Sequence, residues 1–207
     1  MNHLLERPST ATALYVLAHG AGAGMRHPFM DAIAAALHAR AIATYRYEFE
    51  YMTAGKRRPD PAKKLIPAVR AAVIAAAAEA PDLPLIAGGK SMGGRMTSLA
   101  QSQQPLPGVR ALAFLGFPLH APKRDTTDRA EHLRDIDIPM LFVQGTRDTL
   151  ARLELITGVV NDHPTARIHV VETADHGFKV LKRSGRTDEQ TLDEIADAVA
   201  EFALSVS

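Results

Sequence analysis

The feature that most constrains this chain is a repeated alternation between short apolar runs and longer stretches with helical periodicity. The short runs are rich in aliphatic and β-branched residues and almost continuously apolar, which is typical of strands covered on both faces of a sheet. They lie at residues 14–18, 42–45, 85–87, 109–115, 140–143 and 167–171. Because helical patterns separate most of these runs, the sequence predicts an α/β fold. We expect a doubly wound, mainly parallel sheet of about six or more strands, flanked by helices.

The helical patterns occupy residues 29–40, 62–80, 92–103, 150–161 and 188–204. In the second of them, apolar side chains recur every three or four residues, as on the buried face of an amphipathic helix. Thr187 and Gln190 precede the last helix with the spacing of a capping box, and Pro28 stands where the first helix would begin. No repeat or linker interrupts the chain, so we expect residues 1–207 to form a single domain without a lid.

Composition excludes several classes of function. Lys and Arg total 24 against 23 Asp and Glu, which gives a formal net charge of +1. We therefore expect neither nucleic acid nor a membrane as a partner. The chain has no cysteine, which excludes disulfides, thiolate metal sites and a cysteine nucleophile. No apolar run approaches the roughly 20 residues of a membrane span, and the start of the chain lacks the apolar stretch of a signal peptide. These features predict a cytoplasmic protein.

The segment 88–95, GGKSMGGR, follows a predicted strand and precedes a predicted helix. It places Ser91 in the pattern G-x-S-x-G, which marks a nucleophilic serine in this strand–turn–helix context. A serine on so sharp a turn pushes the residues two before and two after it against neighbouring backbone, so only small residues fit there. A glycine-rich loop that merely packs a helix on a strand is the alternative. A phosphate-binding loop is disfavoured, because that motif needs glycine where this chain has Pro84.

A serine hydroxyl needs a base to take its proton, and the base needs an acid to orient it. Asp148 follows the fifth predicted strand, and His176 follows the sixth. Carboxyl ends of parallel strands lie at one edge of a sheet, so both side chains are expected to meet Ser91 there. His163 and His169 fall at a helix end and within a strand, where packing or exposure accounts for them.

Three other carboxylates compete with Asp148 for the role of the acid. Asp175 adjoins His176 in the sequence, so its side chain is expected to point away from that imidazole. Asp125 and Asp128 follow the fourth predicted strand and form the alternative acid position.

The first predicted strand ends in a glycine-rich turn, AHGAGAGM, at residues 18–25. Such a turn can present backbone N–H groups to an oxyanion, together with the N–H of Met92, the residue after the serine. By analogy with other oxyanion holes, we assign the first donor to Ala21. A flexible connection between strand and helix is the alternative interpretation.

Side chains on the loops after the strands could line an apolar acyl site, and the candidates are Phe29, Phe117, Leu119, His120 and Phe178. Core packing is the alternative for each of them. In the irregular segment 47–61, Lys56, Arg57 and Arg58 could attract an anionic substrate, although such a run is more often a solvated loop.

These residues resemble the α/β-hydrolase superfamily, and within it the small lidless branch of dienelactone-hydrolase-like and testis-expressed-protein-like hydrolases. The resemblance covers nearly the whole chain and rests on segments 19–23, 25–30, 88–95, 116–120, 144–148 and 175–178. It implies Ser91 as the nucleophile, His176 as the base and Asp148 as the acid. It also implies backbone donors from Ala21 and Met92.

The chain departs from these relatives in two ways. Dienelactone hydrolases use a cysteine nucleophile, which is absent here, and Lys90 stands where many esterases carry an aromatic, acidic or histidine residue. We therefore expect a serine hydrolase, of carboxylesterase or thioesterase type, that acts on a small ester or thioester without a metal or organic cofactor. A homodimer is compatible with the sequence. The alternative is a hydrolase-fold interaction module without catalysis.

Overall fold

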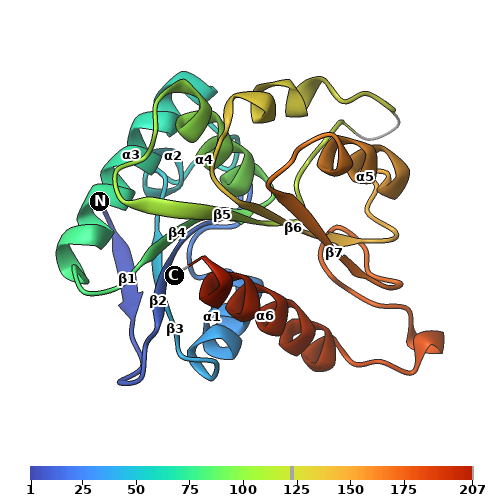
Figure 1. Ribbon diagram of the computed structural model, residues 1–207, viewed down its shortest axis with the longest axis horizontal. Coiled ribbons are helices and arrows are strands. Elements are labelled where there is room, and N and C mark those ends of the chain that lie inside the picture. Colours follow the sequence, from blue (N-terminus) through green and yellow to red (C-terminus); the bar gives the residue numbers. More distant parts are fainter. Residues whose placement is uncertain (122–123, 207) are drawn as a thin grey trace.

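The computed structural model describes residues 1–121 and 124–206, and its centre is a seven-stranded sheet (Figure 1). The spatial order is β1-β3-β2-β4-β5-β6-β7. The strands are β1 (His3–Glu6), β2 (Ala13–Ala18), β3 (Ile42–Tyr47), β4 (Leu85–Lys90), β5 (Val109–Leu115), β6 (Met140–Gly145) and β7 (Ala166–Val171). All neighbouring strands run parallel except β1, which pairs antiparallel with β3. The predicted fold class is confirmed.

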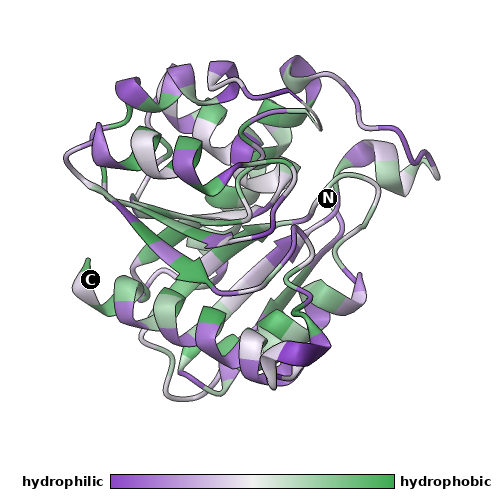
Figure 2. Cartoon of the chain, turned by 90° about the vertical axis from the view of Figure 1, so that its right-hand side faces the viewer, coloured by the Kyte–Doolittle hydropathy of each residue, from purple (hydrophilic) through white to green (hydrophobic). Residues whose placement is uncertain are grey.

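Helices cover both faces of this sheet. One face carries α1 (Pro28–His38) and α6 (Asp188–Ser205), which pack side by side (Figure 1). The other face carries α2 (Glu50–Thr53), α3 (Ala62–Glu79), α4 (Met92–Gln103), α5 (Leu153–Asn161) and the 3₁₀ segment η1 (Asp128–Asp135), and a short 3₁₀ turn, Lys182–Ser184, precedes α6. Figure 2 shows the resulting layers, with the hydrophobic sides of the helices turned toward the sheet. Among the described residues, no helix is both long and apolar enough to cross a membrane.

The core consists of two apolar layers, one on each side of the sheet. Every residue of β2, β3, β4 and β6 is buried, which explains why their sequences are almost continuously apolar. On the α1 and α6 side, Tyr15 is fully buried and its hydroxyl donates to the carbonyl O of Ala113 at 2.7 Å. On the other side, Phe114 and Phe142 pack with ring centroids 4.8 Å apart.

Strand β3 extends two residues beyond the predicted run, because its one charged residue is neutralised inside the fold. Arg46 is only 2% exposed. Its guanidinium forms ion pairs with Asp31 of α1 and Glu6 of β1, and it donates to the carbonyl O of Met25 at 3.1 Å. The sequence analysis missed β1, whose four residues are too few to show a periodic pattern.

Local helix-start signals account for two of the observed helix boundaries, and a loop contact accounts for a third. Thr187 and Gln190 form the predicted capping box at the start of α6, and Pro28 lies in the first turn of α1. Helix α5, predicted to begin at residue 150, begins at Leu153. The preceding residues continue the loop after β6, where the N–H of Leu150 donates to Asp148 Oδ1 at 2.8 Å.

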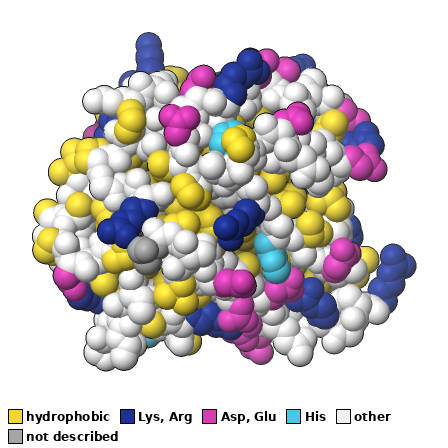
Figure 3. All heavy atoms as spheres, viewed as in Figure 1, with side chains coloured by type: hydrophobic (Ala, Val, Ile, Leu, Met, Phe, Trp, Pro, Cys, Tyr) yellow, Lys and Arg dark blue, Asp and Glu magenta, His cyan; other side chains and the backbone are white. Residues whose placement is uncertain are grey.

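Figure 3 shows one face of the molecule as spheres. Basic and acidic side chains alternate there with hydrophobic ones, and no broad area on this face carries a single sign of charge. This distribution agrees with the near-neutral composition of the chain.

A half-buried histidine joins η1 to α4. His132 Nε2 lies 2.7 Å from the hydroxyl of Ser98 in a hydrogen bond. Burial lowers the pKa of His132 from its ordinary 6.5 to about 4, and the nearby positive charge of Arg95 acts in the same direction. The folded protein therefore holds this imidazole in its neutral form.

We expect His132 to make stability pH-dependent. Between its unfolded pKa of 6.5 and its folded pKa of about 4, the unfolded chain binds more protons than the folded one. Stability is therefore lost as the pH falls through this window, by at most about 1.4 kcal/mol per pH unit and less where solvent screens the ring. His132→Gln should flatten this slope, measured as the free energy of unfolding in urea at about pH 7, 6 and 5. His38→Gln, at an exposed position, is the control and should keep the slope; an equal slope in both variants would contradict the assignment.

Candidate active site

Ser91 lies in the turn between β4 and α4, at the carboxyl end of the sheet. Its backbone has φ +50° and ψ −116°, a conformation that residues other than glycine rarely adopt. The turn packs directly on the end of β2. A Cβ added to Gly93 would stand 2.5 Å from the carbonyl O of Ala18, and one added to Gly89 would overlap the same oxygen. The small residues two before and two after the serine therefore have the steric reason that the sequence pattern predicts.

Ser91, His176 and Asp148 are brought together by three separate loops, each of which follows a strand. His176 Nε2 lies 2.8 Å from Ser91 Oγ, and His176 Nδ1 lies 2.7 Å from Asp148 Oδ2. The side chain of Asp148 is fully buried. It accepts two further hydrogen bonds, from Gln144 Nε2 at 2.6 Å and from the N–H of Leu150 at 2.8 Å. These donors hold the carboxylate in place.

The competing carboxylates have other contacts. Asp175 Oδ1 accepts hydrogen bonds from the N–H groups of Gly177 at 2.8 Å and Lys179 at 3.0 Å, so it shapes the loop that carries His176. Asp125 forms an exposed ion pair with Arg152. Asp128 begins the η1 segment. In the described residues, Asp148 alone of these carboxylates forms a hydrogen bond to the His176 ring.

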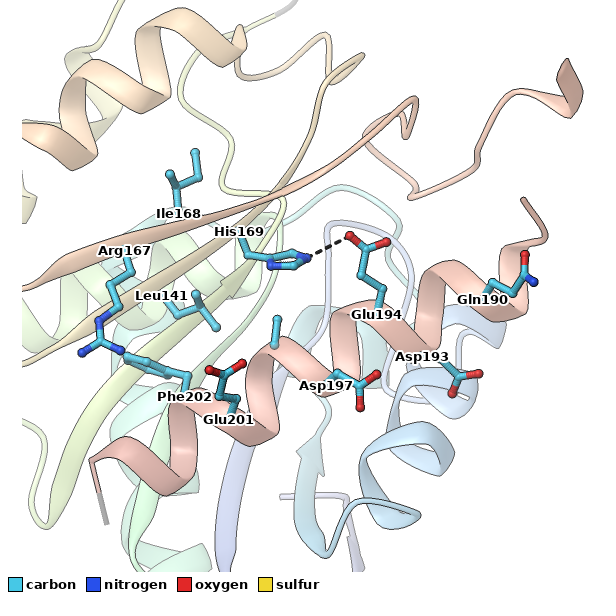
Figure 4. Close-up of a pocket in the computed structure, with 11 residues that line it drawn as sticks. Leu141, Arg167, Ile168, His169, Gln190, Asp193, Glu194, Asp197, Glu201 and Phe202 are labelled. Atoms are coloured by element: carbon cyan, nitrogen blue, oxygen red, sulfur yellow. Dashed lines mark hydrogen bonds and ion pairs between the residues drawn. The ribbon is translucent and has the colours of Figure 1, made fainter. Parts of the chain in front are cut away.

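The other two histidines are also engaged elsewhere. His163 Nδ1 lies 3.3 Å from the hydroxyl of Thr165. His169 Nε2 lies 2.9 Å from Glu194 Oε1, and both residues line a cavity of about 500 Å³ between β7 and α6 (Figure 4). As far as the described residues show, this cavity is lined by no serine, threonine or lysine. The same part of the chain contains no group of three His, Asp or Glu side chains that could hold a metal ion.

The glycine-rich turn after β2 is supported by the segment that follows β3. His19 is fully buried, and its burial lowers its pKa. Its Nε2 accepts from the N–H of Phe49 at 3.2 Å, which leaves Nδ1–H to donate to the carbonyl O of Gly20 at 2.7 Å. The hydroxyl of Tyr51 accepts from the N–H of Gly22 at 3.1 Å. Sequence reasoning missed this support, for which the His-Gly start of the turn was the only signal.

The two predicted oxyanion donors are not engaged by the described part of the chain. Ala21 lines the cavity beside Ser91, and Met92 is the first residue of α4. Within residues 1–121 and 124–206, neither backbone N–H donates a hydrogen bond to another group of the chain. Both are therefore able to donate to a ligand.

A cavity of about 350 Å³ opens beside Ser91 and His176. Phe29 lines it, as predicted, together with Met30 and Leu150, which sequence reasoning missed. Phe178 does not line it but stacks on Phe29, with ring centroids 5.8 Å apart. The cavity wall is therefore apolar close to the serine.

The remaining predicted pocket residues belong to the core and to the support of the acid loop. Phe117 is fully buried against Phe142, with ring centroids 5.6 Å apart, and Leu119 is fully buried in the same layer. His120 is buried too, and its Nε2 accepts from the N–H of Arg152 at 3.1 Å. None of the three lines the cavity beside Ser91. Their apolar or aromatic character serves packing, the alternative that the sequence left open.

Lys90 also lines this cavity, although its side chain is only 9% exposed. Its Nζ donates to the carbonyl O of His176 at 2.6 Å. Burial lowers the pKa of Lys90 to about 8, against the opposing influence of the negative charges of Asp148 and Asp175. The ammonium is thus still mostly charged at neutral pH.

Comparison with known proteins gives the same fold. The sequence model of one protein family, described as an alpha/beta hydrolase domain, matches residues 11–204. A dienelactone hydrolase from Anabaena variabilis is 19% identical with a TM-score of 0.78, over 99% of this chain and 91% of that one. A homologue of alpha-beta serine hydrolases from Coxiella burnetii is 18% identical with a TM-score of 0.74, over 97% and 90%. A lidless serine hydrolase from Xanthomonas campestris is 17% identical with a TM-score of 0.71, over 97% and 88%.

At such identities the solved structures establish likeness of fold alone. The domain model, in contrast, matches nearly the whole chain. Its match agrees with the sheet order, the sharp turn at Ser91 and the contact between that serine and His176. This chain therefore belongs to the alpha/beta hydrolase family.

Proposed function

We propose that this protein is a serine hydrolase that cleaves a small ester or thioester through an acyl-enzyme intermediate. The observation that carries the proposal is the continuous path of hydrogen bonds from Ser91 through His176 to the buried Asp148. Each link has a length at which a proton can be transferred or a ring held in place.

Acylation begins when Ser91 Oγ attacks the carbonyl carbon of the substrate. His176 Nε2 takes the hydroxyl proton, and the ionised Asp148 holds the Nδ1–H tautomer and stabilises the imidazolium that forms. The carbonyl oxygen becomes an oxyanion, which accepts hydrogen bonds from the N–H groups of Ala21 and Met92. The first turn of α4 adds the positive end of its dipole to this stabilisation.

The tetrahedral intermediate then breaks down as His176 gives its proton to the leaving alcohol or thiol. A water molecule enters, His176 takes one of its protons, and the resulting hydroxide attacks the acyl carbon. Ser91 leaves with a proton returned from His176, and the acid product is released. No step requires a group beyond the chain itself and water.

The cavity supports a small substrate. Its volume of about 350 Å³ is at the lower end for ligand pockets, which range from roughly 300 to 1,000 Å³. Phe29, Met30 and Leu150 offer it apolar contact. A short acyl chain would fit these walls better than a long fatty chain would.

We expect a fluorophosphonate probe to form one adduct on the purified protein, at Ser91. The probe requires an activated serine but little fit to the cavity, so it reports on the nucleophile without knowledge of the substrate. Intact mass and peptide mapping locate the adduct. Ser91→Ala and His176→Ala should both abolish it, because one removes the nucleophile and the other its base. A folded protein that forms no adduct would contradict the proposal and favour the interaction module.

We expect Asp148→Asn to lower kcat by roughly 10³- to 10⁴-fold on any ester that the protein cleaves. The new amide nitrogen must either face His176, where it imposes the wrong tautomer, or face the N–H of Leu150, where two donors oppose each other. Asp175→Asn is the matched control. Its amide oxygen can still accept from Gly177 and Lys179, so kcat should stay within a few-fold of the wild type.

Steady-state kinetics on one activated ester would compare the two variants of the previous experiment. A similar loss of kcat in both would show that Asp148 has no special role. Circular dichroism of each variant would separate a loss of chemistry from a loss of folded protein.

A further inference from the structure

Lys90 places an ammonium group beside the nucleophile without an ionic partner. In the described part of the chain, no Asp or Glu forms an ion pair with it. Its Nζ has one hydrogen-bond acceptor, the carbonyl O of His176, and lies 5.1 Å from the ring centroid of Phe178 and 5.7 Å from that of Phe29. An ammonium has three N–H donors, so two of them have no acceptor in the described part of the chain, and Lys90 lines the cavity beside Ser91.

The two nearest carboxylates are committed to other groups. Asp148 accepts from His176, Gln144 and the backbone of Leu150. Asp175 accepts from two backbone N–H groups of its own loop. Neither can turn to Lys90 without breaking the contacts that position His176. The two carboxylates therefore offset the charge of Lys90 only through space, without an ion pair.

Burial of such a charge is energetically unfavourable. Burying an ammonium costs several kcal/mol unless good partners replace its water, and one neutral carbonyl with two aromatic faces replaces it only in part. A methionine would fill a similar volume beside Phe29 and Phe178 without that cost. Packing alone therefore does not account for a charged side chain at this position. An anionic group of the ligand would supply the missing partner.

We propose that Lys90 binds the carboxylate of the substrate, and that the protein hydrolyses short esters whose acyl part carries a carboxylate, such as monoesters of small dicarboxylic acids. This inference rests on the proposed function and names its substrate class. Water adds to the acyl carbon as the ester C–O bond breaks, so that the monoester yields the dicarboxylate, the alcohol and one proton.

The position of Lys90 favours the acyl part over the alcohol part. Lys90 lines the same cavity as Ser91, to which the acyl group becomes covalently attached. An acyl carboxylate can therefore contact the ammonium in the substrate and again in the acyl-enzyme, whereas an alcohol leaves after the first step. The cavity of about 350 Å³ favours a short spacer between the two carbonyl carbons.

The test compares monomethyl succinate with methyl butyrate, in which a methyl group takes the place of the carboxylate. We expect the wild type to favour the succinate ester by roughly 10- to 100-fold in kcat/KM, the range for a charge-assisted hydrogen bond. Methanol release measures both reactions. Lys90→Met and Lys90→Gln should each lower the ratio of the two kcat/KM values at least tenfold. With two variants, the test still gives a result if one of them fails to fold.

The pH dependence of this ratio gives a second readout. Lys90 loses its proton as the pH rises through about 8, so the preference for the succinate ester should decline there. His176, Asp148 and Asp175 also face the ammonium, but their charges act on both esters and largely cancel in the ratio. An equal loss of both activities in Lys90→Met would mean that Lys90 only positions His176, and would overturn the proposal.

A binding measurement separates this inference from the proposed function. Ser91→Ala cannot be acylated, so calorimetry can measure its affinity for intact monomethyl succinate and for methyl butyrate. We expect the succinate ester to bind at least tenfold more tightly, and this advantage to vanish in the double variant with Lys90→Met. Equal affinities would overturn the role of Lys90 even where the fluorophosphonate adduct forms, and a clear advantage without any adduct would leave a carboxylate site in a protein that is no hydrolase.

Discussion

At the carboxyl edge of the sheet, the turn that carries Ser91 and the end of β2 come so close that no side chain fits between them. Gly89 and Gly93 both face the carbonyl O of Ala18 at distances that a Cβ would violate. Ser91 itself has positive φ, a conformation that costs of order 1–3 kcal/mol and persists only where the surroundings enforce it. Packing of the flanking glycines enforces it here, and Ser91 lines the cavity as a result.

A second close approach aligns the acid with the base. Gly145, the last residue of β6, faces the carbonyl O of Ala174 so closely that a Cβ would overlap it. The loop of Asp148 therefore lies directly on the loop of His176, and the 2.7 Å contact between their side chains follows from backbone packing. Both close approaches belong to loops that leave parallel strands at the same edge. The sheet thus fixes the geometry of three side chains that are far apart in the sequence.

The sequence was sufficient for the parts of the protein that depend on local pattern and on strand order. The apolar runs gave six of the strands, and the residues that follow them gave the positions of Ser91, Asp148 and His176. It was insufficient wherever a side chain had to be assigned to one side of a loop. Phe117 and Leu119 follow a strand, as a pocket residue would, but the turn at Gly116 directs them into the core.

The same limit applies to supports that come from distant segments. Tyr51 and Phe49 contact the turn after β2 only because β3 runs beside β2 in the sheet. In the sequence, the charge of Arg46 indicates the end of a strand. The ion pairs with Asp31 and Glu6 explain why the strand continues. Such contacts join residues from different elements, and no spacing within one element encodes them. Pairing of elements had to be known before these roles could be assigned.

Burial has opposite consequences for the two charged groups nearest to Ser91. Asp148 is buried with three hydrogen-bond donors, so its charge is compensated and its position fixed. Lys90 is buried with one acceptor and two aromatic faces, so its charge has no ionic partner in direct contact among the described residues. In a medium of low polarity an uncompensated charge acts more strongly on a ligand than it would in water. The fold can therefore orient a base with one buried charge and select a substrate with the other, a single residue away from the nucleophile.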